Sequence, residues 1–110
     1  MSNYNSLKNK VAEIPKVTTK PMFGFQCYSI LGKFFVGFSN KNYWQAIVRL
    51  PKEAQQIAIK TNGIKPFSHG AKMGWIEIDM TKVPTNSALK WVKKGHDFAK
   101  LLAKQKRKPV

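Results

Sequence analysis

Few side chains in this sequence have the reactivity that an enzyme needs, and their spacing matches no catalytic signature. Cys27 is the single cysteine, and it lies in a run of strand-forming residues, where a cysteine usually serves as a small buried hydrophobe. A catalytic cysteine needs a histidine placed beside it, and no local motif places His69 or His96 in that role. The sequence therefore predicts a protein that is not an enzyme.

Glu77 and Asp79 form a pair of closely spaced carboxylates in a predicted strand. Residues two apart in a strand point to the same face, and paired carboxylates can bind a metal ion or transfer protons. No third ligand accompanies them, and one cysteine with two distant histidines offers no zinc spacing. We interpret the pair as part of a solvated strand face and expect neither a metal nor a cofactor.

The segment from Ser68 to Lys72, SHGAK, combines a histidine, a glycine and a lysine. It lacks the glycine-rich phosphate-loop pattern that ends in Gly-Lys-Ser or Gly-Lys-Thr before a helix. We interpret it as a surface loop. An anion site formed by His69 and Lys72 is the weaker alternative, and it would imply a small enzyme or an anion-binding protein.

Net charge is the most unusual property of the chain, because 20 basic residues oppose 5 acidic residues and give a formal charge of +15. Such a field attracts nucleic acid or another polyanion. All but two of the basic residues, Arg49 and Arg107, are lysines, which act as mobile point charges and favour backbone contacts over base readout. Solubility and compositional bias explain the same charge, and the sequence leaves both interpretations open.

The basic residues are dense at the C-terminus, where only Asp97 opposes them. On a helix they fall outside the apolar stripe, so we expect them on its outer face. This pattern predicts a ridge that follows a phosphate backbone, although lysines near a helix C-terminus also complement the helix dipole. The candidate nucleic-acid-binding residues are Lys90, Lys93, Lys94, Lys100, Lys104, Lys106, Arg107 and Lys108.

Strand signals dominate the first half of the chain. The run from Pro21 to Leu50 is the densest in aromatic and β-branched residues, and Gly32 and Asn40 mark turns within it. The strand before this run belongs at a sheet edge, because Pro21 cannot donate to a central ladder. The predicted strands are Val17–Met22, Gly24–Leu31, Lys33–Ser39, Tyr43–Leu50 and Gly74–Met80.

Two short helical patterns flank these strands. Apolar residues at positions 7, 11 and 14 predict an N-terminal helix that Ser6 caps. A second helix, 52–60, follows Pro51, and residues 64–73 then read as a loop. The stripe that the second helix should bury consists of Ala54, Ile57 and Ala58.

The last predicted helix runs from about Ser87 to Lys104 and carries a broad apolar stripe that includes Leu101. Gly95 lies in its middle, where a glycine costs about 1 kcal/mol of stability relative to alanine. We expect this glycine at a close crossing of the helix over the sheet.

Together these elements predict a two-layer α+β fold, with an antiparallel sheet of about five strands and helices packed on one face. A chain of 110 residues is expected to form one domain, here with an N-terminal segment 1–15, a domain 16–105 and a basic tail 106–110. One cysteine allows no internal disulfide, and the sequence lacks both a membrane span and the apolar core of a signal peptide. We expect a cytoplasmic protein with no membrane contact.

The face of the sheet away from the helices is a candidate partner surface. Alternation in the strand that begins at Tyr43 sends Trp44 and Ala46 toward the helices and their neighbours outward. Exposed aromatic rings amid polar groups indicate a protein partner or a homodimer, unless the N-terminal segment or a loop covers them. The partner-face residues are Tyr43, Gln45, Arg49, Trp75 and Glu77.

Several motifs follow one another in a recognisable order. They are Met-Phe-Gly at 22–24, Gly-Lys at 32–33, Tyr-Trp at 43–44, Pro-Phe at 66–67, Val-Pro at 83–84 and Ala-Leu-Lys-Trp-Val at 88–92. Over about residues 17–103 this order resembles the TfoX N-terminal domain family of bacterial competence regulators. The resemblance implies an α+β fold similar to that of type III secretion chaperones and of YjbR-like domains, some of which are regarded as DNA-binding. It implies no catalytic residues.

The chain departs from that family in two ways. Family members usually continue Met-Phe-Gly with a second glycine, and here Phe25 takes its place. The longer members also carry a C-terminal helical domain that this chain lacks. Two hypotheses follow: a non-enzymatic regulatory domain that binds nucleic acid without base specificity through its basic last helix, and a protein-interaction or homodimerising adaptor that uses the open sheet face.

Overall fold

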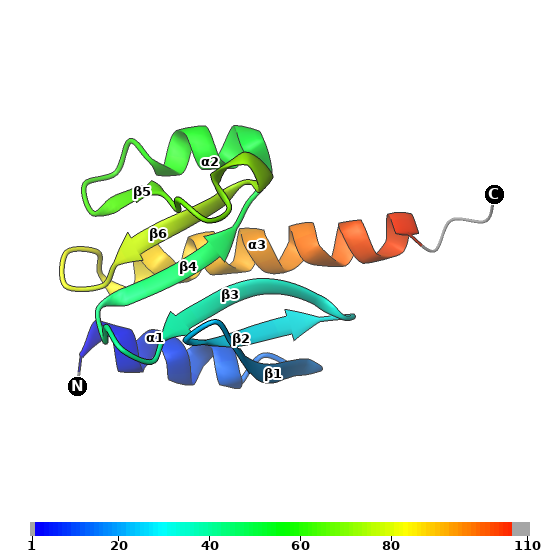
Figure 1. Ribbon diagram of the computed structural model, residues 1–110, viewed down its shortest axis with the longest axis horizontal. Helices are drawn as coiled ribbons and strands as arrows, with labels where there is room; N and C mark the ends of the chain where they lie inside the picture. The colour runs from blue at the N-terminus through cyan, green and yellow to red at the C-terminus, as the bar shows by residue number, and fades with distance from the viewer. Residues whose placement is uncertain (1, 107–110) are drawn as a thin grey trace.

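Six strands form a single antiparallel sheet in the computed structural model, which describes residues 2–106 (Figure 1). The strand order is β1-β2-β3-β4-β6-β5, so consecutive strands are neighbours except β4 and β5, between which β6 lies. The expected α+β fold is confirmed. The elements are α1 (Asn3–Ala12), β1 (Val17–Met22), β2 (Phe25–Ile30), β3 (Lys33–Ser39), β4 (Gln45–Arg49), α2 (Lys52–Ala58), β5 (Ile64–Pro66), the 3₁₀ turn η1 (Ala71–Met73), β6 (Trp75–Asp79) and α3 (Thr85–Lys106).

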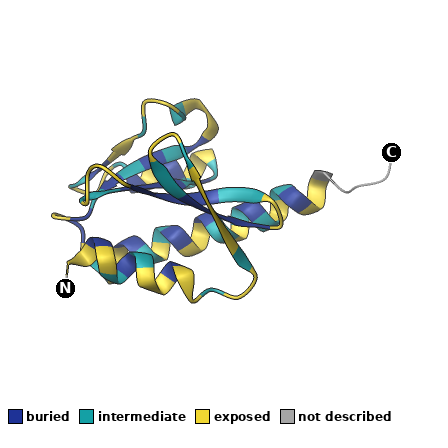
Figure 2. Cartoon of the chain, turned by 60° about the horizontal axis from the view of Figure 1, so that its bottom comes forward, coloured by how far each residue is buried: buried dark blue, intermediate teal, exposed yellow. Residues whose placement is uncertain are grey.

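Helices α1 and α3 lie side by side on one face of the sheet, and each shows its buried residues to the strands (Figure 2). From α1 the core receives Tyr4, Leu7 and Val11. The Tyr4 hydroxyl donates a hydrogen bond of 2.6 Å to the Ser39 carbonyl. The helix face that packs on the sheet in α3 is built from small residues, namely Ala88, Val92, Gly95, Ala99 and Ala103.

Gly95 lies where α3 crosses β3 and β4. A Cβ atom there would lie 2.8 Å from both the Arg49 carbonyl oxygen and Val48 Cγ1. Real Cβ atoms essentially never approach that closely, so only glycine fits without moving the sheet or the helix. The expected close crossing is therefore confirmed.

Two hairpins with the same turn geometry join β1 to β2 and β2 to β3. Phe23 and Gly24 have φ of 52° and 80°, and Leu31 and Gly32 have the same pair of values. Positive φ at both central residues is the feature of a type I′ turn, which matches the right-handed twist of the flanking strands. The predicted turn at Gly32 is confirmed, and the Met-Phe-Gly motif forms a second turn of the same kind.

A β-bulge distorts the pairing of β2 with β3. Tyr28 pairs with Val36 whereas Ser29 pairs with Phe34, so Phe35 is an extra residue on β3. Because of this bulge, Phe35 and Val36 are both buried in the core. Phe34 consequently projects from the opposite face of the sheet, where it lines a hollow.

Three expectations for element boundaries are wrong. Residues 64–73 are not a loop throughout: Ile64–Pro66 forms strand β5, which pairs with β6, and Ala71–Met73 forms the 3₁₀ turn η1. The N-terminal helix starts at Asn3 because the side chain of Ser2, not that of Ser6, accepts the capping hydrogen bond from Asn5 N–H. The last helix begins at Thr85, two residues before the expected Ser87.

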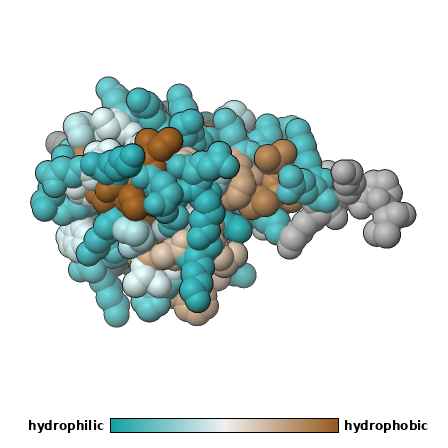
Figure 3. All heavy atoms as spheres, turned by 90° about the horizontal axis from the view of Figure 1, so that it is seen from above, coloured by the Kyte–Doolittle hydropathy of each residue, from teal (hydrophilic) through white to brown (hydrophobic). Residues whose placement is uncertain are grey.

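The buried stripe of α2 also differs from the expected one. Ile57 is 60% exposed, while Gln55 and Ala58 are buried. The Gln55 amide donates to the carbonyls of Ala71 and Trp75, at 2.9 and 3.1 Å, so a satisfied polar side chain replaces the expected apolar one. Viewed from the α2 side, the surface is mainly hydrophilic with small separate apolar areas (Figure 3).

None of the helices in residues 2–106 has the combination of length and hydrophobicity that crossing a lipid bilayer requires.

Candidate functional site

The sheet face away from α1 and α3 is organised by one row of residues that runs across six strands. Successive strand pairs place Lys20 opposite Cys27, Cys27 opposite Gly37, Gly37 opposite Ile47, Ile47 opposite Glu77, and Glu77 opposite Lys65. Directly opposed residues share a face. The row therefore has a lysine at each edge of the sheet, and between them Cys27, Gly37 and Ile47 form a small or apolar floor beside the carboxylate of Glu77.

A hollow of about 700 Å³ lies over this floor. Its size falls within the range of small-molecule binding pockets, about 300 to 1,000 Å³. Its walls come from hairpin β1–β2, strands β2, β3 and β6, and the loop after β5. Five aromatic residues line it: Phe23, Phe25, Phe34, Phe67 and Trp75.

Rings from distant parts of the chain meet along one side of this hollow. Phe25 of β2 and Phe67 after β5 lie edge to face, with ring centroids 5.8 Å apart. Phe67 also contacts the His69 ring at 5.5 Å. The loop after β5 thus reaches the ring of Phe25 on β2, and the hollow is bounded by contacts that the sheet register alone does not provide.

The indole of Trp75 is held in place by the same loop. The Phe67 N–H donates to the Trp75 carbonyl at 3.1 Å. A Cβ atom at Gly70 would lie 2.5 Å from Trp75 Cδ1, so the glycine leaves the room that the ring occupies. Trp75 is therefore a positioned aromatic wall.

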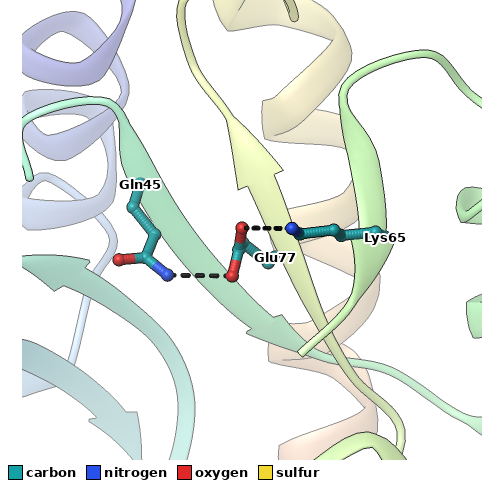
Figure 4. Close-up of polar contacts among 3 residues, drawn as sticks. All are labelled: Gln45, Lys65 and Glu77. Atoms are coloured by element: carbon teal, nitrogen blue, oxygen red, sulfur yellow. Dashed lines mark hydrogen bonds and ion pairs between the residues drawn. The ribbon is translucent and has the colours of Figure 1, made fainter. Parts of the chain in front are cut away.

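Glu77 supplies the carboxylate of the hollow, and its neighbours on β4 and β5 hold it (Figure 4). The Gln45 side-chain amide donates to Glu77 Oε1 at 2.9 Å, and Lys65 Nζ lies 3.6 Å from Glu77 Oε2. The Glu77 side chain is 13% exposed while that of Lys65 is 72% exposed. The carboxylate is thus fixed in the hollow, and its partner cation lies at the solvent side.

Cys27 forms part of the floor and is buried. Burial raises the pKa of the Cys27 thiol above its ordinary value, because a low-dielectric setting disfavours the thiolate. A neutral thiol is a poor nucleophile, and this position agrees with the expected role of a small buried hydrophobe.

The predicted partner face is only partly assembled. Gln45, Trp75 and Glu77 all line the hollow. Tyr43 does not belong to that face, because its ring packs edge-on to Tyr4 of α1 with 5.7 Å between centroids. It precedes the first residue of β4, so strand alternation does not apply to it.

Arg49 also lies apart from the hollow. Its Nε donates to the Met73 carbonyl at 3.3 Å, and its guanidinium lies 5.7 Å from the ring centroid of Phe98 on α3. The side chain therefore extends toward α3 at the end of β4.

Sequence reasoning missed four aromatic walls: Phe23, Phe25, Phe34 and Phe67. Alternation in β2 would have placed Phe25 on the same face as Cys27, two residues later. The bulge at Phe35 conceals Phe34, because it breaks the alternation of β3. For Phe67 no local signal exists, since only the folded loop brings its ring to Phe25.

Helix α3 carries the predicted basic ridge on the side away from the sheet. Lys90, Lys93, Lys94 and Lys104 are exposed, and Lys100 is half-buried. At about 100° per residue, all five fall within an arc of about 120°. The side chain of Lys106 and the whole of Arg107 and Lys108 lie outside the described residues.

Two neighbours interrupt this ridge. Leu101 is 52% exposed, so its expected place on the apolar stripe is wrong; it lies two turns after Lys94 and shares that face. Asp97 Oδ1 lies 3.3 Å from Nδ1 of His96, whose ring packs on Phe35. The ion pairs found among the described side chains are Lys65–Glu77 and His96–Asp97, so none of them uses Lys90, Lys93, Lys94, Lys100 or Lys104.

Asp79, the second carboxylate of the predicted pair, is engaged at the end of β6. Its Oδ1 accepts hydrogen bonds from the Thr81 N–H and hydroxyl, at 2.9 and 2.6 Å. It therefore stabilises the turn toward α3.

Comparison with known proteins identifies likeness of fold. No family model matches the chain, and a search of curated proteins gives no significant match. A crystal structure of a Deinococcus radiodurans protein with the DUF419 domain is similar, with a TM-score of 0.73 and 15% identity, over 99% of this chain and 83% of that one. A Pseudomonas syringae protein is similar over 86% of this chain and 97% of its own, with a TM-score of 0.69 and 9% identity. At these identities the likeness shows the fold alone.

Proposed function

We propose that this protein is a non-catalytic regulatory domain that binds nucleic acid through the lysine ridge of α3, without base specificity. One observation carries the proposal: the five lysines of α3 whose side chains the structure describes share one arc on the side away from the sheet. The formal charge of +15 supports it, because such a field concentrates polyanions at the surface. The resemblance to the TfoX N-terminal domain family supports the regulatory part.

The dimensions of the ridge suit a phosphate backbone. Lys90 and Lys104 are 14 positions apart, which corresponds to about 21 Å along the helix axis. Phosphates of one DNA strand are about 3.4 Å apart along the axis, so the ridge can contact several in succession. Lysine lacks the planar fork with which arginine reads guanine, and for this reason we expect similar affinity for unrelated sequences.

The test is a titration of fluorescent duplex DNA at several KCl concentrations. Each phosphate contact contributes about −0.9 to the slope of log K against log salt, so five lysines give a slope of about −4.5. Changing Lys93→Gln and Lys104→Gln together should weaken binding at low salt and reduce the slope by about 2. Glutamine has nearly the helix propensity of lysine, so the fold should be retained.

The matched control removes the same charge from another place. Lys52 and Lys60 are exposed and lie at α2, and the double change Lys52→Gln and Lys60→Gln should leave the slope nearly unchanged. If both double changes weakened DNA binding equally, overall charge, and not the ridge, would account for the binding. Absence of binding by the wild-type protein at low salt would overturn the proposal.

A further inference from the structure

The aromatic hollow on the open sheet face has the features of a ligand site, and it lies on the opposite side of the sheet from α3. Its volume of about 700 Å³ admits a small molecule of nucleotide size. Ring walls come from several elements, and Trp75 is held by the loop after β5. Flat ligands suit such walls, because a π-system gains by stacking and by edge-to-face contact.

The carboxylate that lines the hollow, Glu77, can bind hydrogen-bond donors of a ligand. Ionised Glu77 is an acceptor only, and the Gln45 amide N–H is already directed at it. Gln45 therefore keeps its amide oxygen, a second acceptor, and one further N–H for a ligand, while Ser68 and His69 in the lining can donate or accept. Guanine is the nucleobase that presents adjacent donors, an N–H and an NH₂, on one edge.

The positive charge of the protein favours a ligand that carries an anionic group. Lys20 and Lys65 lie at opposite ends of the row that crosses the floor, and Lys72 is exposed on η1. With a formal charge of +15, the protein attracts an anion and repels basic peptides. A phosphate on the ligand therefore complements the rim.

We propose that the hollow binds a guanine nucleotide, with the base between the aromatic rings, its N–H edge on Glu77 and its phosphate at the rim of the hollow. The ligand is either a free mononucleotide or an unpaired nucleotide of a strand, since both present the same base and phosphate. This inference does not rest on the α3 ridge.

The competing occupant of this face is a second copy of the chain. Each copy carries a formal charge of +15, and this like charge opposes the association of two copies. A single anionic nucleotide fits the charge of the face better than a homodimer does.

The exposed ring at the entrance supports a binding role. Phe23 is 93% exposed and lies at the tip of hairpin β1–β2 with φ of 52°. A bulky residue at positive φ is disfavoured, and an exposed aromatic gains nothing from burial. Its twin position, Leu31, has the same φ but does not line the hollow.

The test is an NMR titration of the ¹⁵N-labelled protein with GMP, AMP and UMP, which follows the indole N–H of Trp75. The buffer contains about 0.2 M KCl, which weakens non-specific electrostatic binding of the phosphate to surface lysines. We expect saturable shifts with GMP, and affinity about tenfold higher than for AMP. Glu77→Gln should lower the GMP affinity about tenfold or more and remove the preference, because hydrogen bonds to a charged group are lost.

Twin hairpin variants supply the control. Phe23→Asn should weaken GMP binding about fivefold or more through loss of stacking, while Leu31→Asn leaves it unchanged. Both create Asn-Gly, the preferred pair for a type I′ turn, so neither result can be attributed to unfolding. The double change Lys93→Gln and Lys104→Gln should also leave GMP binding unchanged, which separates this site from the ridge.

A second arm distinguishes the two sources of the nucleotide. A five-nucleotide DNA strand with one central guanine is compared with the all-thymine strand and with GMP. Tighter binding of the guanine strand than of GMP identifies a strand as the source, whereas equal affinity identifies the free nucleotide. The proposal is overturned if neither probe binds, if binding persists in Glu77→Gln and Phe23→Asn, or if sedimentation shows a dimer that GMP does not dissociate.

Discussion

At the level of single residues, Gly95 sets the distance between α3 and the sheet. The atoms that a side chain would meet belong to the backbone of Arg49 and to Val48, which cannot move independently of β4. An alanine at position 95 would therefore gain stability from its higher helix propensity and lose stability from the close contact with β4.

We predict that Gly95→Ala destabilises the protein. Alanine gains about 1 kcal/mol in helix propensity, whereas overpacking a close contact costs about 1–3 kcal/mol, so we expect a net loss of up to about 2 kcal/mol. Urea unfolding measures the difference. Lys94→Ala, at the exposed neighbour, should stay within about 0.5 kcal/mol of wild type; a Gly95→Ala protein more stable than wild type would show that α3 does not pack as closely as described.

At the level of elements, hairpins β1–β2 and β2–β3 have the same turn geometry, but only the first lies at the hollow. Leu31 and Phe23 both adopt positive φ before a glycine, a conformation that costs a non-glycine residue roughly 1–2 kcal/mol. Asparagine tolerates this region better because its short side chain can hydrogen-bond locally. Both residues therefore carry the same strain, although only Phe23 lines the hollow.

We predict that Leu31→Asn raises the free energy of unfolding by about 0.5–1 kcal/mol, since it relieves the strain of leucine at positive φ. Thermal and urea unfolding would measure it. Leu101→Asn is the control, because Leu101 is similarly exposed but lies in a helix, where asparagine is the poorer former and should lower stability. If Leu31→Asn and Leu101→Asn changed the free energy of unfolding equally, the positive φ at Leu31 would be contradicted.

At the level of the whole molecule, the formal charge of +15 acts on every part of the fold. Only 5 acidic residues are present to offset it, and one of them, Glu77, is paired in the hollow. Mutual repulsion of lysines destabilises the compact state, and salt screens it, since the Debye length falls from about 30 Å at 0.01 M to about 10 Å at 0.1 M.

We predict that the Tm rises by roughly 4 °C or more when KCl is raised from about 0.01 to 0.3 M, which corresponds to about 1 kcal/mol for a domain of this size. Calorimetry in a buffer without phosphate would measure it. Changing Lys52, Lys60, Lys93 and Lys104 together to glutamine lowers the formal charge by four, and should raise the Tm at low salt and flatten its salt dependence. A Tm that is independent of KCl in both proteins would show that charge repulsion does not limit stability.

Local sequence determined much of the fold. Strand β3 follows the predicted bounds, and the Gly32 turn and the close crossing at Gly95 were predictable because each depends on neighbouring residues or on one missing side chain. The lysines of α3 were predicted on its outer face because helical periodicity alone places them there. In these cases the physical cause lies within a few residues of its effect.

Tertiary structure decided the hollow. The bulge at Phe35 turns Phe34 outward, and the loop after β5 brings Phe67 to Phe25 across the sheet. Strand order places Glu77 between Gln45 and Lys65, although these residues are far apart in the chain. The sequence by itself determined most of the strands and helices and the outer face of α3, because these follow from periodicity, whereas β5 did not. Which side chains meet around a cavity depends on register, bulges and loop path, and these are settled only when the whole sheet forms.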